Sequence, residues 1–325
     1  MATERLHKPI QESYNKMEAR LAVVSEHAPG RRWEQRMESM TEKKINSGRG
    51  FVHYWTAGPS PEKASSREAQ AVFFLPGLTA NHHLFDFQTA HFASRFRVLV
   101  WDAPAHGKSR PCSGFSYSIL AEELRAILAA EGIGHVVLIG QSAGGFVAQS
   151  FAAKYPDMVT GMLLIGTCPY GPAYYSGSDL FWLKQTKWMF RLFPDRILRH
   201  SMARMCSVSD TGRKNMLQML TDYDKKELCR LMYLGLAGFI PEIRDTRLSC
   251  PVWLLVGAHD RTGKVRKYND LWHQREGYPS FIIKNAAHNA NVDQPEEVNR
   301  IIEGFLEGCM ADGFPGSPSA PSPVS

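Results

Sequence analysis

The stretch HVVLIGQSAGGFVAQSFAAKYP, residues 135–156, changes its hydrophobic period in the middle. The run VVLI (136–139) is typical of a buried strand, whereas GFVAQSFAAKYP (145–156) is alanine-rich and amphipathic like a helix. Between them, GQSAG (140–144) holds one serine between two glycines. Glycine leaves room beside a residue held at a strained backbone angle. The stretch therefore predicts a strand–turn–helix unit that lifts the hydroxyl of Ser142 clear of a sheet.

Six further runs of strand length occur along the chain. They are FVHYWTA (51–57), AVFFLPG (71–77), RVLVWDA (97–103), VTGMLLIG (159–166), PVWLLVG (251–257) and SFIIK (280–284). Most of them lack a polar face, which is typical of strands covered on both sides by helices. Helical patterns follow several of these runs, notably at 116–132 and 295–308. The alternation predicts an α/β fold with a mainly parallel central sheet flanked by helices.

The alternation is interrupted once, by a long helical stretch. Residues 169–248 contain consecutive helical segments and no convincing strand, which predicts an all-helical cap inserted into an α/β core of 49–168 and 249–310. The expected helix starts are Ser178 or Asp179, Ser209 or Asp210, and Asp224. Six of the 13 methionines lie in this stretch. They could form an adaptable pocket roof, although methionines at helical spacing are more often core residues.

The two ends of the chain differ in composition from the middle. Residues 1–48 interleave charged residues with short apolar runs and predict a helical arm. Residues 311–325 are mostly Pro, Ser and Gly and predict a flexible tail, because they cannot offset the entropy lost on ordering. The amino terminus lacks the continuous apolar centre of a secretory signal, which favours a cytoplasmic location.

Composition narrows the classes of partner. No apolar run approaches the roughly 20 residues that cross a bilayer, so we expect no membrane span. The net charge of +6 is small for 38 basic and 32 acidic residues, and the basic runs at 196–200 and 264–267 contain no aromatic residue, which argues against nucleic acid. The small excess of positive charge remains compatible with an anionic substrate or an acyl carrier. Six separated cysteines without a CxxC pair predict reduced thiols and neither disulfides nor a zinc site.

A serine hydroxyl becomes a useful nucleophile only beside a general base, often a histidine that a carboxylate orients. Asp260 comes three residues after the strand 251–257, and His288 lies between the last predicted strand and the last helix. The order Ser142, Asp260, His288, each behind a different strand, is one in which such triads occur. The other histidines in loops after strands are His82, His83 and His106. Position along the chain favours His288.

From about Gly50 to Gly308 the chain resembles the α/β-hydrolase superfamily. The stretch FFLPGLTAN (73–81) is similar to the oxyanion loop of that family, with Pro-Gly where many members have His-Gly. VWDAPAHGKSRP (100–111) resembles the segment D-x-x-G-x-G-x-S, and Ala105 departs from glycine.

This resemblance implies roles for several residues. The backbone N–H groups of Leu78 and Ala143 correspond to the oxyanion hole, and 169–248 corresponds to the helical cap above the active site. Asp102 and His106 correspond to residues that shape a neighbouring loop and do not catalyse.

The resulting expectation is a serine hydrolase that cleaves a carboxylic ester or a related acyl compound through an acyl-enzyme, without metal or organic cofactor. Its partner would be a small apolar acyl molecule. The same triad could instead cleave a carbon–carbon bond, a lactone or a thioester, and Gly257-x-x-Asp260-Arg261 resembles a segment of several carbon–carbon hydrolases. A non-hydrolytic ligand-binding protein is a further alternative on this scaffold. Epoxide hydrolases and haloalkane dehalogenases use a carboxylate nucleophile, against which Ser142 argues.

Overall fold

A computed structural model describes residues 40–59, 70–242 and 248–311 of the chain. The first 39 residues of the predicted arm and residues 312–325 of the predicted tail lie outside the described residues. No helix in the described part combines the length and the apolar character that crossing a bilayer requires.

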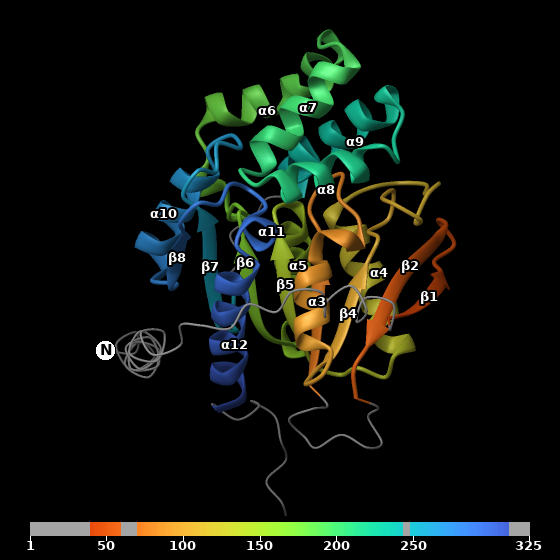
Figure 1. Ribbon diagram of the computed structural model, residues 1–325, viewed down its shortest axis with the longest axis vertical. Coiled ribbons are helices and arrows are strands. Elements are labelled where there is room, and N and C mark those ends of the chain that lie inside the picture. The colour runs from red at the N-terminus through yellow and green to blue at the C-terminus, as the bar shows by residue number, and fades with distance from the viewer. Residues whose placement is uncertain (1–39, 60–69, 243–247, 312–325) are drawn as a thin grey trace, which may run out of the picture.

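An eight-stranded sheet forms the centre of the molecule (Figure 1). The strands are β1 (Thr41–Asn46), β2 (Phe51–Ala57), β3 (Ala71–Leu75), β4 (Arg97–Trp101), β5 (Val136–Gln141), β6 (Val159–Ile165), β7 (Val252–Gly257) and β8 (Ser280–Ile283). Their order is β1-β2-β4-β3-β5-β6-β7-β8, and only β1–β2 and β2–β4 pair antiparallel. The predicted α/β fold with a mainly parallel sheet is confirmed, and all seven predicted strands are present.

The helical arm predicted for 1–48 is wrong at its carboxyl end, where residues 41–46 form β1. This strand pairs with β2 from Thr41↔Thr56 to Asn46↔Phe51 at the edge of the sheet. Nearly all of its side chains are exposed, so the sequence TEKKIN shows no alternation of apolar and polar residues. Charged residues such as Lys43 and Lys44 are frequent on edge strands because they discourage pairing with another chain. A strand exposed on both faces cannot be distinguished by period from an exposed helix.

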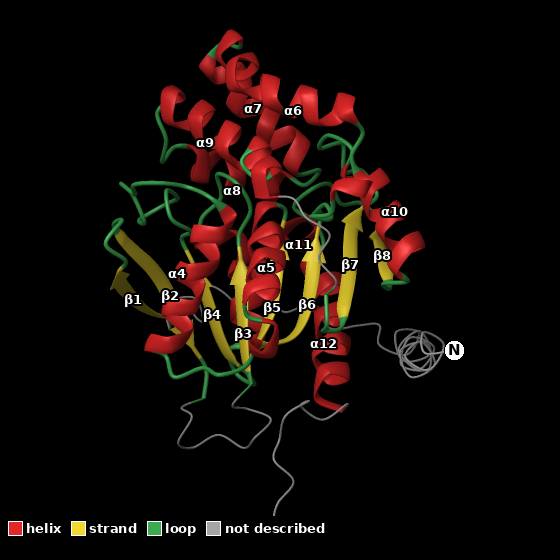
Figure 2. Ribbon diagram, turned by 180° about the vertical axis from the view of Figure 1, so that it is seen from behind, coloured by secondary structure: helices red, strands yellow, loops and turns green. Residues whose placement is uncertain are grey.

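Helices cover both faces of the sheet, as opposite views of the molecule show (Figures 1 and 2). Helices α3 (Asp86–Phe92), α11 (Ala290–Asp293) and α12 (Pro295–Ala311) pack on one face. Helices α4 (Tyr117–Ala130), α5 (Ala143–Lys154) and α10 (Val265–Glu276) pack on the other. Along β3, Val72 and Phe74 join the first apolar core, whereas Phe73 and Leu75 join the second. Burial on both faces explains the unbroken apolar runs in the sequence.

Between β6 and β7 the described chain forms helices and no strand. They are α6 (Gly177–Met189), α7 (Asp195–Cys206), α8 (Asp210–Leu220) and α9 (Lys225–Ala237). Three short 3₁₀ turns also lie in this segment: η3 (Pro172–Tyr174), η4 (Phe190–Leu192) and η5 (Ile240–Glu242). Two others lie elsewhere in the chain: η1 (His82–Phe85) follows β3, and η2 (Pro156–Met158) follows α5. Helices α6 to α9 lie together beyond one end of the sheet (Figure 1). We refer to them as the cap helices.

Two of the predicted helix starts in this stretch agree with the structure. Ser209 caps α8 and Asp224 caps α9 with its side chain. Helix α6 starts earlier than predicted, because Ser176 is its cap and Asp179 closes a capping box from the third helical position. An aspartate in the first turn therefore gave a false start two to three residues too late.

Candidate active site

Ser142 occupies a sharp turn between β5 and α5, with φ 51° and ψ −117°. A Cβ at Gly140 would lie 2.7 Å from the backbone O of Gly144, and a Cβ at Gly144 would lie 1.9 Å from the backbone O of Leu75. Both positions therefore accept only glycine without movement of the backbone. A non-glycine residue in such a conformation costs about 1–3 kcal/mol, and it persists where the surrounding structure over-determines it.

His288 and Asp260 form a buried pair. Nδ1 of His288 lies 2.8 Å from Oδ2 of Asp260, and the two side chains are 6% and 0% exposed. The other carboxylate oxygen accepts the backbone N–H of Thr262 at 2.8 Å. Burial by itself raises the pKa of Asp260, but the charge and the hydrogen bond of the His288 ring, together with the hydrogen bond from Thr262, lower the pKa below 3.8. Asp260 is thus a carboxylate that can orient the imidazole and leave Nε2 for chemistry.

The turn that carries Ser142 is joined to the loop that carries His288. Nε2 of Gln141, the residue before the serine, donates to the backbone O of His288 at 3.1 Å and to Oδ1 of Asn289 at 3.2 Å. Gln141 is only 2% exposed. Two segments 147 positions apart in the chain are therefore held together by buried hydrogen bonds.

Gly166 places the end of β6 against the same group of residues. A Cβ on Gly166 would lie 3.1 Å from Nδ1 of His288 and 3.3 Å from Oδ2 of Asp260. The backbone O of the neighbouring Ile165 accepts the N–H of Ser142 at 2.8 Å.

No hydrogen bond joins Ser142 Oγ to His288 among the described residues in this conformation. Such bonds are often long in unliganded enzymes and shorten when substrate binds.

Asp293 connects the His288 loop to the cap helices, and its role was not apparent from the sequence. Its carboxylate accepts the N–H of Ala287 at 2.9 Å, of Val208 at 3.0 Å and of Ser209 at 3.0 Å. The Asn289 N–H also donates to Cys206 at 2.7 Å. The only available signal was an acidic residue five positions after His288, and its partners Val208 and Ser209 lie over 80 positions away.

The predicted oxyanion donors lie on either side of the serine turn. Ala143 is the first residue of α5, so its N–H has no partner within the helix. Leu78 follows Gly77, where a Cβ would lie 3.1 Å from Cβ of Ser142. Among the described residues, neither of these two N–H groups donates a hydrogen bond. The oxyanion role of these two N–H groups stays a prediction.

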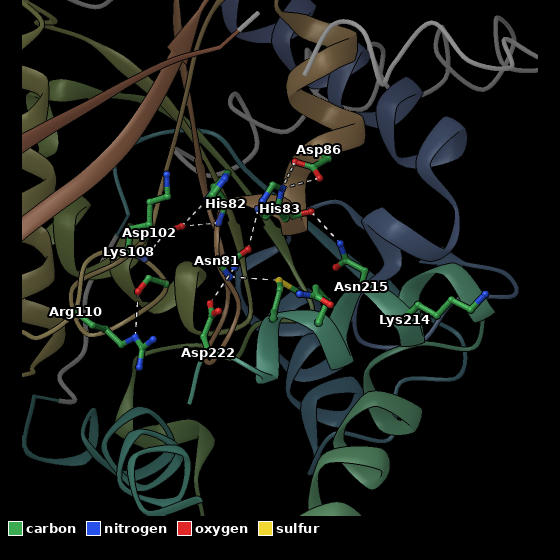
Figure 3. A pocket seen from close by; sticks show the side chains of 13 residues that line it. Asn81, His82, His83, Asp86, Asp102, Lys108, Arg110, Lys214, Asn215 and Asp222 are labelled. Carbon is green, nitrogen blue, oxygen red and sulfur yellow. Dashed lines mark hydrogen bonds and ion pairs between the residues drawn. The ribbon is translucent and has the colours of Figure 1, made fainter. Parts of the chain in front are cut away.

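The histidine and the aspartate that the resemblance assigned to a loop do have structural partners. Asp102 accepts the N–H of Lys108 at 2.7 Å and both the N–H and the ring of His82 at 2.8 Å (Figure 3). His106 is 3% exposed, and its burial lowers its pKa to about 4. His83 faces Asp86 at 3.1 Å. Nδ1 of His106 lies 3.1 Å from the backbone O of Pro104, whereas its buried Nε2 has no hydrogen-bond partner among the described residues.

A cavity of about 780 Å³ lies beside this loop, between η1 and α8 (Figure 3). Most of the residues that line it are polar or charged, among them Asn81, His82, Lys108, Arg110 and Asp222. The side chains of Ser142, Asp260 and His288 do not line it. It is therefore a separate hollow from the region around the serine.

Known proteins resemble this chain in sequence and in structure. A family model described as alpha/beta hydrolase fold matches residues 70–210. The 2-(acetamidomethylene)succinate hydrolase of Mesorhizobium japonicum is 30% identical over 73% of this chain and 87% of its own. Epoxide hydrolase 3 of Xenopus tropicalis is 25% identical over 73% and 71%. A thermophilic esterase from Thermogutta terrifontis superposes with a TM-score of 0.65, at 22% identity over 83% of this chain and 99% of its own.

These relatives are named hydrolases or an esterase, and each match covers at least 73% of this chain. Because the similarity to the Mesorhizobium enzyme reaches 30% over more than two thirds of that protein, it reflects common descent as well as a shared fold. The chain belongs to the α/β-hydrolase family of enzymes.

Proposed function

We propose that the protein is a serine hydrolase that cleaves a carboxylic ester or a related acyl compound, with Ser142, His288 and Asp260 as its triad. The observation that carries the proposal is the strained turn at Ser142, which lies next to the buried His288–Asp260 pair. A serine held at φ 51° has no evident structural use, whereas a nucleophile gains exposure from it.

The mechanism follows from the positions of these groups. His288 takes the proton of Ser142 through Nε2 while Oγ attacks the carbonyl carbon, and Asp260 holds the imidazole in the required tautomer. The negative oxygen then accepts hydrogen bonds from the N–H groups of Leu78 and Ala143. His288 returns its proton to the leaving group, and a water activated by the same ring releases the acyl group. Each oxyanion donor of this kind contributes roughly 3 kcal/mol to lowering the barrier.

Apolar surroundings favour an apolar acyl group. Leu78 extends toward α9, since a Cβ on Gly235 would lie 2.3 Å from Leu78 Cδ1. Phe146, in the first turn of α5, stacks on Phe239 with ring centroids 4.7 Å apart. Three of the six cap methionines, Met216, Met219 and Met232, are buried, with at most 7% exposure.

A carboxylate nucleophile is disfavoured for this chain, although two relatives are named epoxide hydrolases. Those reactions require an aspartate or glutamate at the nucleophile turn, and this turn carries Ser142.

The sequence identifies the nucleophile more narrowly than it identifies the type of bond that is cleaved. Cleavage of a carbon–carbon bond, a lactone or a thioester is the second candidate for the same triad. One relative is named a 2-hydroxy-6-oxononadienedioate hydrolase, and one similar structure is named an N-acyl homoserine lactone degrading enzyme.

Two measurements on the full chain test the proposal. A fluorophosphonate should label the wild type and not Ser142→Ala, and p-nitrophenyl acyl esters, lactones, dienones and acyl thioesters should reveal turnover that Ser142→Ala lacks. Ser201→Ala, which removes an exposed serine on α7, serves as the matched control and should behave like the wild type. A folded wild type that is inert to the probe and to the whole panel contradicts the proposal. Ligand binding of equal affinity in wild type and Ser142→Ala, without turnover, indicates the non-hydrolytic alternative.

A further inference from the structure

The exposed large hydrophobic side chains of the described residues are concentrated in the segment that runs from α6 through η4 to α7. Seven of the nine lie between residues 181 and 205, and the other two, Phe51 and Ile282, lie on β2 and β8. The seven are Phe181, Trp182, Trp188, Leu192, Phe193, Ile197 and Met205. We call them the cap apolar surface. A water-soluble surface rarely gathers so many large apolar groups without an interaction partner.

Five of the seven side chains lie on α6 and α7 and are exposed because of how these two helices pack. On α6, Thr186 is buried, whereas Phe181 and Trp188 lie two turns apart on one exposed side. On α7, Leu198 and Ala203 are buried and Ile197 is 55% exposed. Helix α6 packs on α9, and α7 packs on α8. Helices α6 and α7 lie at the end of the molecule farthest from the sheet (Figure 1).

The same segment carries a concentrated positive charge. Residues 180–209 contain six Lys or Arg side chains and one acidic residue, Asp195, in a chain with a net charge of +6. Asp195 pairs with Arg199 at 2.9 Å. The remaining basic side chains are Lys184, Lys187, Arg191, Arg196 and Arg204, and the described residues provide no ion pair to any of them. All five of these residues are exposed. Excess cationic charge therefore surrounds the apolar groups.

We propose that the cap apolar surface docks on an anionic lipid bilayer, with α6 and α7 lying in the interface. Tryptophan and phenylalanine enter the boundary between headgroups and acyl chains, and surrounding lysine and arginine side chains bind anionic headgroups. Other partners that could cover the cap apolar surface match its surrounding positive charge less well. A second copy of this surface would bring like charges together, and residues 1–39 contain seven basic and six acidic residues and so offer little negative charge. The docking is peripheral and needs no spanning helix.

Vesicle binding of the full chain tests this inference without any measurement of activity. The wild type should float with vesicles of phosphatidylcholine containing phosphatidylserine, and much less with phosphatidylcholine alone. Trp182→Ser with Trp188→Ser should lower the partition coefficient at least tenfold. Lys184→Gln with Lys187→Gln should lower it about fivefold for each charge removed. The matched controls Ile282→Ser and Lys284→Gln change exposed residues on or next to β8 and should bind like the wild type.

A second measurement uses the wild type alone and does not depend on how the variants fold. Brominated lipids should quench part of the tryptophan fluorescence when anionic vesicles are added, and 0.5 M salt should weaken the binding because the Debye length falls to a few ångströms. Absence of binding to anionic vesicles, or binding that the Trp182 and Trp188 changes leave intact, overturns the proposal. A wild-type dimer that the same changes dissociate indicates instead that a second copy covers this surface, and also overturns it.

Discussion

Nδ1 of His288 and Oδ2 of Asp260 lie 2.8 Å apart in a region from which solvent is almost excluded. Asparagine at position 260 keeps the shape of the side chain but loses the negative charge, and it no longer specifies the imidazole tautomer. We expect Asp260→Asn to lower kcat on an accepted acyl ester by about 10⁴. Asp102→Asn is the control, because Asp102 is equally buried but binds the neighbouring loop. Similar losses of kcat per folded molecule in both variants would argue against the assigned triad.

The same carboxylate makes the free energy of unfolding depend on pH. The pKa of Asp260 in the folded protein lies below its ordinary 3.8, so the ionised group stabilises the fold above pH 3.8 and this contribution is lost as the pH falls through the folded-state value. We expect the free energy of unfolding to fall less steeply below pH 4 in Asp260→Asn than in the wild type. Urea unfolding from pH 7 to pH 3 measures this difference. Parallel curves would exclude a depressed pKa at this site.

Backbone strain at Ser142 should be measurable as stability. Glycine accepts φ 51° and ψ −117° more readily than any residue with a Cβ, so Ser142→Gly should raise the free energy of unfolding by about 1–3 kcal/mol. Ser142→Ala retains the Cβ and serves as the control, which should change stability little. Thermal and urea unfolding of the two variants, both inactive, provide the comparison. Equal stabilities would mean that the turn is not strained.

Gly144 and Gly308 provide a matched pair of glycines in helices. A Cβ at Gly144 would lie 1.9 Å from the backbone O of Leu75, whereas Gly308 on α12 has no atom within 4 Å of that position. We expect Gly144→Ala to destabilise the protein by about 1–3 kcal/mol or more and to abolish labelling at Ser142. Gly308→Ala should stabilise it by about 0.5–1 kcal/mol. The prediction fails if the two variants unfold at the same denaturant concentration.

Asp293 should link the stability of the cap helices to activity. Replacing it by alanine leaves the N–H groups of Ala287 and Val208 without their charged acceptor, at a cost of at least about 2 kcal/mol. We expect Asp293→Ala to lower kcat on an ester as well, because the His288 loop loses its anchor. Asp270→Ala, at an exposed position of α10, is the control. Wild-type kcat in a destabilised Asp293→Ala would show that the loop keeps its position without this carboxylate.

The candidate site was only partly predictable from the sequence. Ser142, Asp260 and His288 each follow a strand with a strong apolar pattern, so their position at one edge of the sheet could be inferred from order alone. Gln141 and Asp293 could not be recognised in this way. Their partners, such as His288 for Gln141 and Val208 for Asp293, are distant in the chain, and a lone polar residue carries no periodic signal.

The sequence by itself determined the α/β alternation, the seven predicted strands and the turn at Ser142, because apolar runs of strand length and the need for glycine are local patterns. The tertiary structure alone decided that 41–46 is an edge strand, since an exposed strand owes its conformation to hydrogen bonds with β2. It also decided which apolar residues of the cap remain exposed. Phe181 and Thr186 both belong to α6, and packing against α9 determines which one is buried.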